Sequence, residues 1–75
     1  MITVKLFGLV RLDTGIKELQ IEAKNVGQLQ KALARYIPEE KIKGCLVLVD
    51  GKPANRFTKL HDGDQVMLMS PVAGG

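Results

Sequence analysis

The chain has 75 residues, a formal net charge of +3 and a hydrophobic content of 45%. A chain of this length forms one domain and buries only roughly 60% of the surface that its unfolded form exposes. The composition excludes a disordered chain and leaves little room for a deep internal active site. The basic residues are scattered and have few aromatic residues among them, which argues against a nucleic-acid-binding surface.

Cys45 is the only cysteine, so no internal disulfide can form. Because the chain has one thiol and no predicted signal peptide, we expect a cytoplasmic protein. No apolar run approaches the ~20 residues that a membrane-spanning helix needs. Cys45 is interpreted as a core residue rather than a nucleophile or sulfur relay, because free cysteine is among the most buried residue types.

The first segments of the chain predict two strands. Apolar and polar side chains alternate over residues 2–10, and they alternate again over residues 16–23. Asp13, Thr14 and Gly15 supply turn residues between these runs. We therefore expect an N-terminal β-hairpin.

The hydrophobic period changes to that of a helix near Asn25. The spacing of Asn25 and Gln28 is that of a capping box, with Asn in place of Ser or Thr. Apolar residues then recur at helical spacing as far as Ile37, and Pro38 disfavours helix at the residue before it. One helix is expected over residues 26–37, with Gly27 as a weak point in its first turn.

The second half of the chain predicts three strands. Residues 45–49 form a continuous apolar run, and Asp50 with Gly51 is a strong hairpin signal after it. Pro53 suits only an edge strand or an irregular segment. A turn over residues 61–64 and a strand over residues 65–70 complete an α+β domain, in which the helix covers one face of the sheet.

His61, Asp62 and Asp64 could be taken for metal ligands or paired catalytic carboxylates. A structural zinc site almost always needs four ligands, and no second His or Cys lies near His61 in the sequence. The two aspartates flank Gly63, as turn residues do. All three are therefore interpreted as parts of a turn.

The order of elements, the Asp-Gly-Asp turn and the ending over residues 71–75 resemble the MoaD and ThiS sulfur carriers of the ubiquitin-like β-grasp superfamily. The resemblance is closest to MoaD, the molybdopterin synthase small subunit, which typically ends in Pro-Pro-Val-Ser-Gly-Gly. Here Ser70 replaces the first proline and Ala73 the serine. The resemblance implies a mixed sheet of four to five strands packed on one α-helix, with a β-grasp domain over residues 1–71 and a flexible tail over residues 72–75.

The resemblance implies that the working group is the C-terminal carboxylate of Gly75. No side chain from Gln65 to Gly75 is charged, and glycine lacks a Cβ, so this end can thread a narrow channel. An ATP-dependent adenylating enzyme would convert the carboxylate to an acyl-adenylate, and a sulfurtransferase or cysteine desulfurase would supply the sulfur of a thiocarboxylate. The other tail residues are Val72, Ala73 and Gly74.

The chain is accordingly expected to be a cosubstrate, or the small non-catalytic subunit of molybdopterin synthase, rather than an enzyme. The expected acceptor is the large subunit of that synthase. The alternatives are a ThiS-like donor for thiazole synthase or tRNA thiolation, a ubiquitin-like modifier that forms isopeptide bonds through Gly75, and an inert interaction module. We expect no bound cofactor, metal, membrane contact or direct nucleic-acid contact, since ATP belongs to the activating partner.

The strand pattern also predicts an apolar patch on the sheet face away from the helix. The side chains that alternation sends to this face are Phe7, Leu46, Leu48, Met67 and Met69. In the β-grasp order their strands are neighbours, and Pro71 lies beside them in the sequence. Such a patch usually marks a protein interface, and methionine adapts to several partners. The alternatives are isolated surface apolar residues, or burial by sheet twist.

Overall fold

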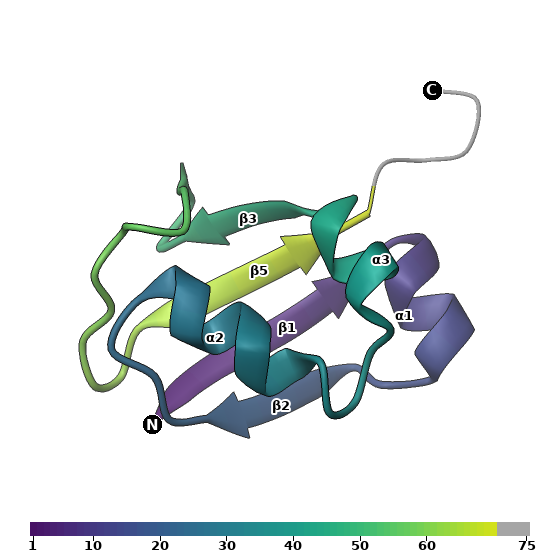
Figure 1. Cartoon of the computed structure of the whole chain (residues 1–75), viewed down its shortest axis with the longest axis horizontal. Coiled ribbons are helices and arrows are strands. Elements are labelled where there is room, and N and C mark those ends of the chain that lie inside the picture. Colours follow the sequence, from purple (N-terminus) through teal and green to yellow (C-terminus); the bar gives the residue numbers. More distant parts are fainter. Residues whose placement is uncertain (71–75) are drawn as a thin grey trace.

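The computed structural model of the chain describes residues 1–70, so Pro71 and the predicted tail over residues 72–75 lie outside them. One five-stranded mixed sheet has the strand order β2-β1-β5-β3-β4 (Figure 1). The strands are β1 (Ile2–Phe7), β2 (Glu18–Ile21), β3 (Leu46–Val49), β4 (Lys52–Pro53) and β5 (Gln65–Met69). The helices of the described residues are α1 (Leu9–Thr14), α2 (Val26–Leu33) and α3 (Glu39–Lys43). The predicted α+β fold and mixed sheet are confirmed.

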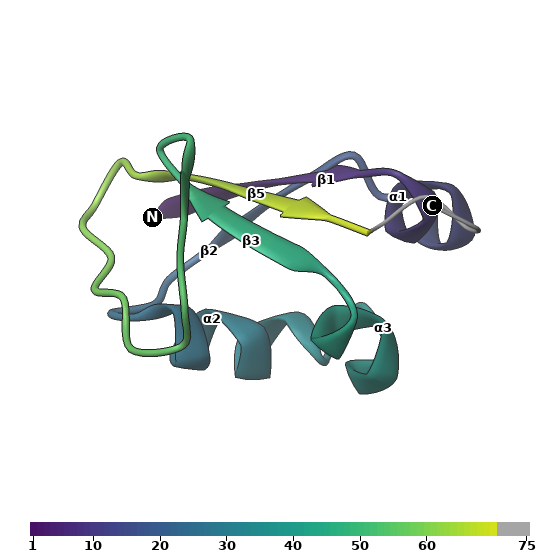
Figure 2. The same cartoon turned by 90° about the horizontal axis from the view of Figure 1, so that it is seen from above.

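The sheet is built around β1 and β5, which pair in parallel. β2 pairs antiparallel with the other edge of β1, and β3 pairs antiparallel with the other edge of β5. Strands from both halves of the sequence therefore meet at the centre of the sheet. Figure 2 shows α2 and α3 together on one face of this sheet and α1 at the end of β1.

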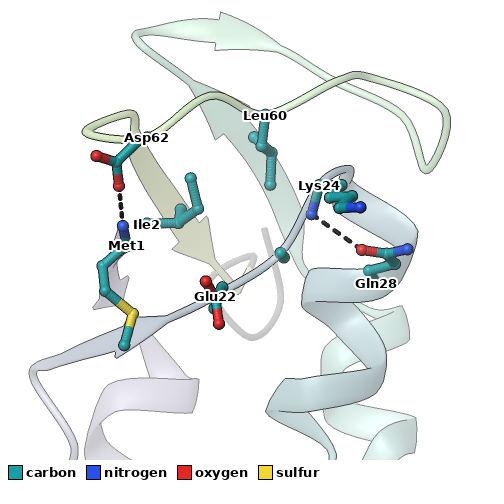
Figure 3. Close-up of a pocket in the computed structure, with 8 residues that line it drawn as sticks. Met1, Ile2, Glu22, Lys24, Gln28, Leu60 and Asp62 are labelled. Atoms are coloured by element: carbon teal, nitrogen blue, oxygen red, sulfur yellow. Dashed lines mark hydrogen bonds and ion pairs between the residues drawn. The ribbon is translucent and has the colours of Figure 1, made fainter.

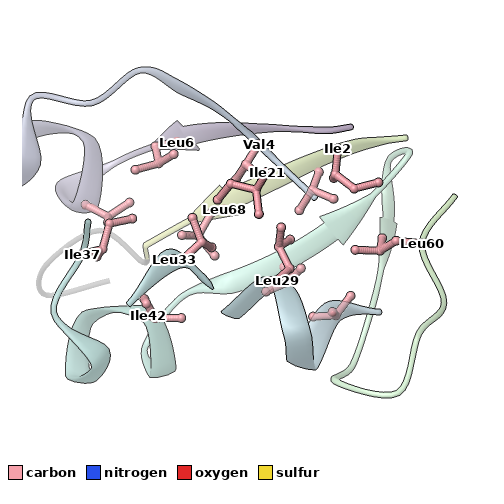
Figure 4. Packing of buried hydrophobic residues seen from close by; sticks show 14 residues of the cluster. Ile2, Val4, Leu6, Ile21, Leu29, Leu33, Ile37, Ile42, Leu60 and Leu68 are labelled. Carbon is pink, nitrogen blue, oxygen red and sulfur yellow. The ribbon is translucent and has the colours of Figure 1, made fainter. Parts of the chain in front are cut away.

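The hydrophobic core fills the space between the sheet and the helices α2 and α3 (Figure 4). Ile2, Val4 and Leu6 of β1 are at most 2% exposed. Leu29 and Leu33 of α2 are at most 1% exposed and belong to the same cluster. Every buried side chain of the described residues is hydrophobic, so no polar group there needs a buried partner.

The start of α2 is capped as predicted. The backbone N–H of Gln28 donates to Asn25 Oδ1 at 2.8 Å, and Gln28 Oε1 accepts from the backbone N–H of Lys24 at 2.9 Å. The reciprocal bond of the capping box thus falls one residue earlier than usual. α2 ends at Leu33, before the predicted boundary, and the N–H of Ile37 donates to Leu33 O at 2.9 Å in a closing turn.

The predicted N-terminal hairpin is correct in its strand pairing and wrong in its connection. The first strand ends at Phe7, because Gly8 adopts φ 77° and ψ −149°, a region that side chains avoid. The six-residue helix α1 follows and ends at Gly15, whose N–H donates to Arg11 O at 2.9 Å. The two strands are therefore joined through a helix instead of a short turn.

The structure adds α3 to the single helix that was predicted. Glu39 and Glu40 lie in its first turn and Lys41 and Lys43 in its last, the charge order that the helix dipole favours. Ile42 is 2% exposed and fixes α3 against the core. None of the helices of residues 1–70 has the length and apolar character to cross a membrane.

The two turns predicted in the second half of the chain are present. Asp50 and Gly51 have φ values of 50° and 84°, as a two-residue hairpin with the favoured right-handed strand twist requires. In the second turn, Asp64 Oδ2 accepts from the N–H of His61 at 2.8 Å. Asp62 pairs with the α-amino group of Met1, which holds the pKa of this carboxyl below its usual value (Figure 3). Asp64 thus stabilises the turn and Asp62 binds the N-terminus beside it, as their interpretation as turn residues predicts.

Candidate functional site

The sheet face away from α2 carries the predicted apolar side chains in two rows. Phe7 of β1 lies opposite Met69 of β5, which lies opposite Leu46 of β3. In the next row, Met67 lies opposite Leu48. Directly opposed residues share a sheet face, and their strand neighbours are the buried core residues, so this face points away from the core. We call Phe7, Leu46, Leu48, Met67 and Met69 the outer patch.

The outer patch is only partly exposed. Leu46 is 51% exposed, whereas the other four side chains are half-buried. Adjacent apolar side chains on neighbouring strands shield one another, which the strand pattern alone cannot show. Lys5 of β1 also lies opposite Met67, on the side of β5 away from Leu48. Its amine places a positive charge at the edge of the outer patch. The patch therefore offers a contiguous apolar surface with one exposed end at Leu46.

Ser70 is the last described residue, and both its backbone N–H and its hydroxyl form hydrogen bonds. Its N–H donates to Phe7 O at 3.2 Å, and its Oγ accepts from the N–H of Val10 at 2.8 Å. A proline at this position could make neither bond, because it has no N–H and no hydroxyl. The substitution noted in the sequence thus ties the end of β5 to the start of α1.

Gly8 completes this contact. A Cβ at Gly8 would lie 2.6 Å from the carbonyl oxygen of Ser70 and 2.9 Å from its Oγ. Only glycine allows so close an approach at this positive φ. We call the contact of Ser70 with Phe7, Gly8 and Val10 the tail anchor. Sequence reasoning placed Gly8 inside a strand and missed it, although an isolated glycine in a strand pattern is a known signal of close backbone approach.

A groove of about 220 Å³ lies beside the tail anchor, and its lining includes Leu9, Lys41 and Ser70. An ion pair of 2.5 Å between Lys41 Nζ and Asp13 Oδ2 joins α3 to α1. The hydrogen bond and charge of Asp13 raise the pKa of Lys41. On α1, Leu9 is 40% exposed and Leu12 is 78% exposed. The apolar surface near the tail anchor therefore extends onto α1, which the strand prediction missed.

Cys45 packs against the core, as predicted. Its thiol donates to Lys41 O at 3.0 Å, and burial raises its pKa. A raised thiol pKa leaves little thiolate, which is the nucleophilic form. His61 is exposed, and within residues 1–70 no group of three or more His, Cys, Asp or Glu is arranged to hold a metal ion.

The raised pKa of Cys45 predicts slow alkylation of the folded protein. At pH 7, iodoacetamide should modify Cys45 more slowly than a free cysteine, because partial burial limits access to the thiol and lowers its thiolate fraction. Intact-mass spectrometry over time measures the rate, and the same protein in urea is the control. A folded protein that reacts as fast as the unfolded one would restore a nucleophilic role for Cys45.

The fold is shared with several ubiquitin-like proteins. Small archaeal modifier protein 1 from Haloferax volcanii superimposes with a TM-score of 0.78 at 23% identity, covering 99% of this chain and 98% of that one. Urm1 from Trypanosoma brucei superimposes with a TM-score of 0.75 at 27% identity, covering 99% of this chain and 94% of that one. A chain of molybdopterin-converting factor from Helicobacter pylori, solved as a complex of subunits 1 and 2, superimposes with a TM-score of 0.72 at 26% identity. The match covers 99% of this chain and 97% of that one. The chain is thus a ubiquitin-like β-grasp protein.

The family follows from the sequence match. The ThiS family model matches residues 4–75. The chain therefore belongs to the ThiS family, and it is a ubiquitin-like sulfur carrier of the ThiS and MoaD type. No curated protein sequence matches it significantly.

Proposed function

We propose that the chain carries sulfur as a thiocarboxylate on Gly75. On an activating enzyme, a carboxylate oxygen of Gly75 attacks the α-phosphorus of ATP, which releases pyrophosphate and leaves an acyl-adenylate. A persulfide of a sulfurtransferase or cysteine desulfurase attacks the acyl carbon, and AMP leaves. A second thiol then reduces the resulting acyl disulfide and frees the thiocarboxylate. ATP binds to the activating partner, and this chain holds no cofactor of its own.

The observation that carries this proposal is that the family match extends through Gly75 and includes both terminal glycines. The tail anchor supports it, because Ser70 bonds to Phe7 of the outer patch. A partner that covers the outer patch therefore lies next to Ser70, from which the chain continues toward Gly75. The fold supplies a docking surface and a fixed starting point, and the partners supply the acid-base and metal chemistry.

Molybdopterin formation is the proposed destination of the sulfur. The Helicobacter pylori chain named above is part of molybdopterin-converting factor, and a putative subunit 1 of that factor from Pyrococcus furiosus superimposes with a TM-score of 0.78 at 26% identity. We propose that the acceptor is a large subunit of molybdopterin synthase, which would use the thiocarboxylate as its sulfur source. Thiazole synthase and tRNA thiolation are the alternative destinations of the sulfur.

A second function, protein modification, is favoured by the likeness to Urm1 and to small archaeal modifier protein 1. The same acyl-adenylate of Gly75 would then be attacked, directly or through a thioester, by a lysine amine to form an isopeptide bond. Both functions share the activation step. They differ in the nucleophile that finally takes the acyl group.

Intact-mass spectrometry distinguishes these functions. The chain is incubated with its activating enzyme, ATP and a persulfide donor, and we expect a product about 16 Da heavier, from the exchange of one oxygen for sulfur. High-mass conjugates on a denaturing gel would favour the modifier. If neither product forms while the enzyme consumes ATP with a known carrier, the tail is inert and the proposal is wrong.

The outer patch is tested by Met67→Asp. The charge would be buried against the activating enzyme, so we expect binding to weaken by about 2 kcal/mol, whereas folding should lose about 1 kcal/mol or less at this half-buried site. Titration calorimetry and urea unfolding measure the two quantities. Tyr36→Asp is the control, because Tyr36 is a large aromatic side chain that is 54% exposed and lies outside the sheet. Unchanged affinity of the Met67→Asp protein would remove the outer patch from the interface.

A further inference from the structure

A basic groove lies on the opposite side of the molecule from the outer patch. α2, α3 and the loop between β4 and β5 surround it, and Figure 2 shows these segments together on the helix side of the sheet. The groove has a volume of about 370 Å³, and a hollow of about 360 Å³ adjoins it. Gly27, Lys31 and Arg56 line both, so the two form one continuous surface. We call it the helix-side groove.

The backbone fixes the shape of the helix-side groove. The N–H of Gly27 donates to Arg56 O at 2.9 Å, and the N–H of Val26 donates to Thr58 O at 3.0 Å. A Cβ at Gly27 would lie only 3.2 Å from Arg56 O, so the glycine permits this approach. The loop is therefore tied to the first turn of α2, and Arg56 is held on the same surface as Lys31.

The helix-side groove carries a net positive charge. Lys31, Lys43 and Arg56 line it, against the single carboxylate of Glu39. The ion pairs found within residues 1–70 involve none of these three cations. α2 itself contains no acidic residue. The surface therefore presents a positive potential that attracts a negatively charged partner.

An exposed aromatic ring adjoins these charges. Phe57 is 73% exposed and lines the adjoining hollow. The guanidinium carbon of Arg56 lies 4.9 Å from the centre of the Phe57 ring, as in a cation–π contact. Aromatic and Arg side chains side by side are enriched at protein interfaces. One ring with few cations does not make the row of stacking rings along a basic channel that binds single-stranded nucleic acid.

We propose that the helix-side groove binds an acidic segment of a partner protein. Carboxylates of that segment would meet Lys31, Lys43 and Arg56, and an apolar side chain would pack on Phe57. Because the outer patch lies on the other side of the sheet, both surfaces can be occupied together. The proposal does not depend on the chemistry of Gly75.

Nuclear magnetic resonance titration with a defined probe tests the proposal. The probe is a twelve-residue peptide that repeats Asp-Glu-Leu, and the neutral probe repeats Asn-Gln-Leu. We expect the acidic peptide to shift the amide resonances of Lys31, Lys43, Arg56 and Phe57, and the neutral peptide to leave them unchanged. The Lys31→Gln, Arg56→Gln double variant should bind the acidic peptide about tenfold more weakly.

The matched control is the Lys17→Gln, Lys52→Gln double variant, which removes the same charge from exposed sites outside the groove. Its affinity should change less than about twofold. Equal losses in both double variants, or shifts spread over all lysines, would show attraction by net charge alone and overturn the proposal. Tighter binding of an oligouridine of equal charge at the same resonances would overturn the peptide assignment in favour of nucleic acid. Absence of any shift at millimolar peptide would also refute the site.

Discussion

We expect deletion of Gly75 to abolish formation of the proposed thiocarboxylate and to leave the free energy of unfolding unchanged within about 0.5 kcal/mol. The remaining carboxylate, on Gly74, would be one residue, about 3.5 Å, short of its position in the activating enzyme. Reacting atoms must approach to about 3–3.5 Å, so a shift of this size removes the near-attack geometry and costs more than about 100-fold in rate. Intact mass after incubation with activating enzyme, ATP and persulfide donor measures the yield.

Two further variants distinguish the effect of tail length from that of tail composition. One glycine added after Gly75 should be as inactive as the deletion, because it displaces the carboxylate in the other direction. Ala73→Gly keeps the length and should retain most of the yield. Full yield from the shortened protein would show that the sulfur-carrying group lies elsewhere, and the assignment of Gly75 would be wrong.

Gly8→Ala has the largest expected effect on folding. A side chain at this positive φ costs about 1–3 kcal/mol, and the added Cβ at 2.6 Å from Ser70 O forces the backbone to move. We expect a total loss of about 2–4 kcal/mol, a large share of the stability of a domain this small. Urea unfolding, followed by circular dichroism, measures the change in the free energy of unfolding.

Gly15→Ala is the matched control for the tail anchor. Gly15 has φ 74°, close to the φ of Gly8, but nothing lies within 4 Å of a Cβ built there. Its substitution should cost about 1 kcal/mol, from the backbone conformation alone. The excess loss in Gly8→Ala combines the clash of the added Cβ with Ser70 and the greater backbone strain at Gly8, whose ψ of −149° differs from the 3° of Gly15. Equal losses in the two variants would mean that neither contribution is present, and the close approach of Gly8 to Ser70 would be wrong.

Strand and helix periods predicted most of the elements. Alternation predicted β1 and β2, a continuous apolar run predicted β3, and the helical period with the Asn25 and Gln28 cap predicted the start of α2. The helices α1 and α3 were not predicted, because helices of six and five residues are too short for a hydrophobic period to show. Leu9 and Val10, the first two residues of α1, were interpreted as the end of the first strand.

Some properties of the candidate site were also predictable from the sequence, and others were not. The outward direction of Met67 and Leu48 follows from a period of two, which each strand carries within its own sequence. The degree of their burial depends on neighbouring strands, and no single segment contains that information. The proposed role of Gly75 as acyl donor, by contrast, depends only on local sequence and on family membership.

The sequence by itself determined the elements with a clear period, the two glycine turns and the family, because each rests on residues close together in the chain or on a pattern along it. Only the tertiary structure decided the tail anchor and the helix-side groove. Val10 and Ser70 are 60 positions apart and meet because β1 and β5 pair in parallel. Arg56 meets α2 through the backbone bond to Gly27. Contacts of this kind depend on how separate segments pack in space, which no local pattern encodes.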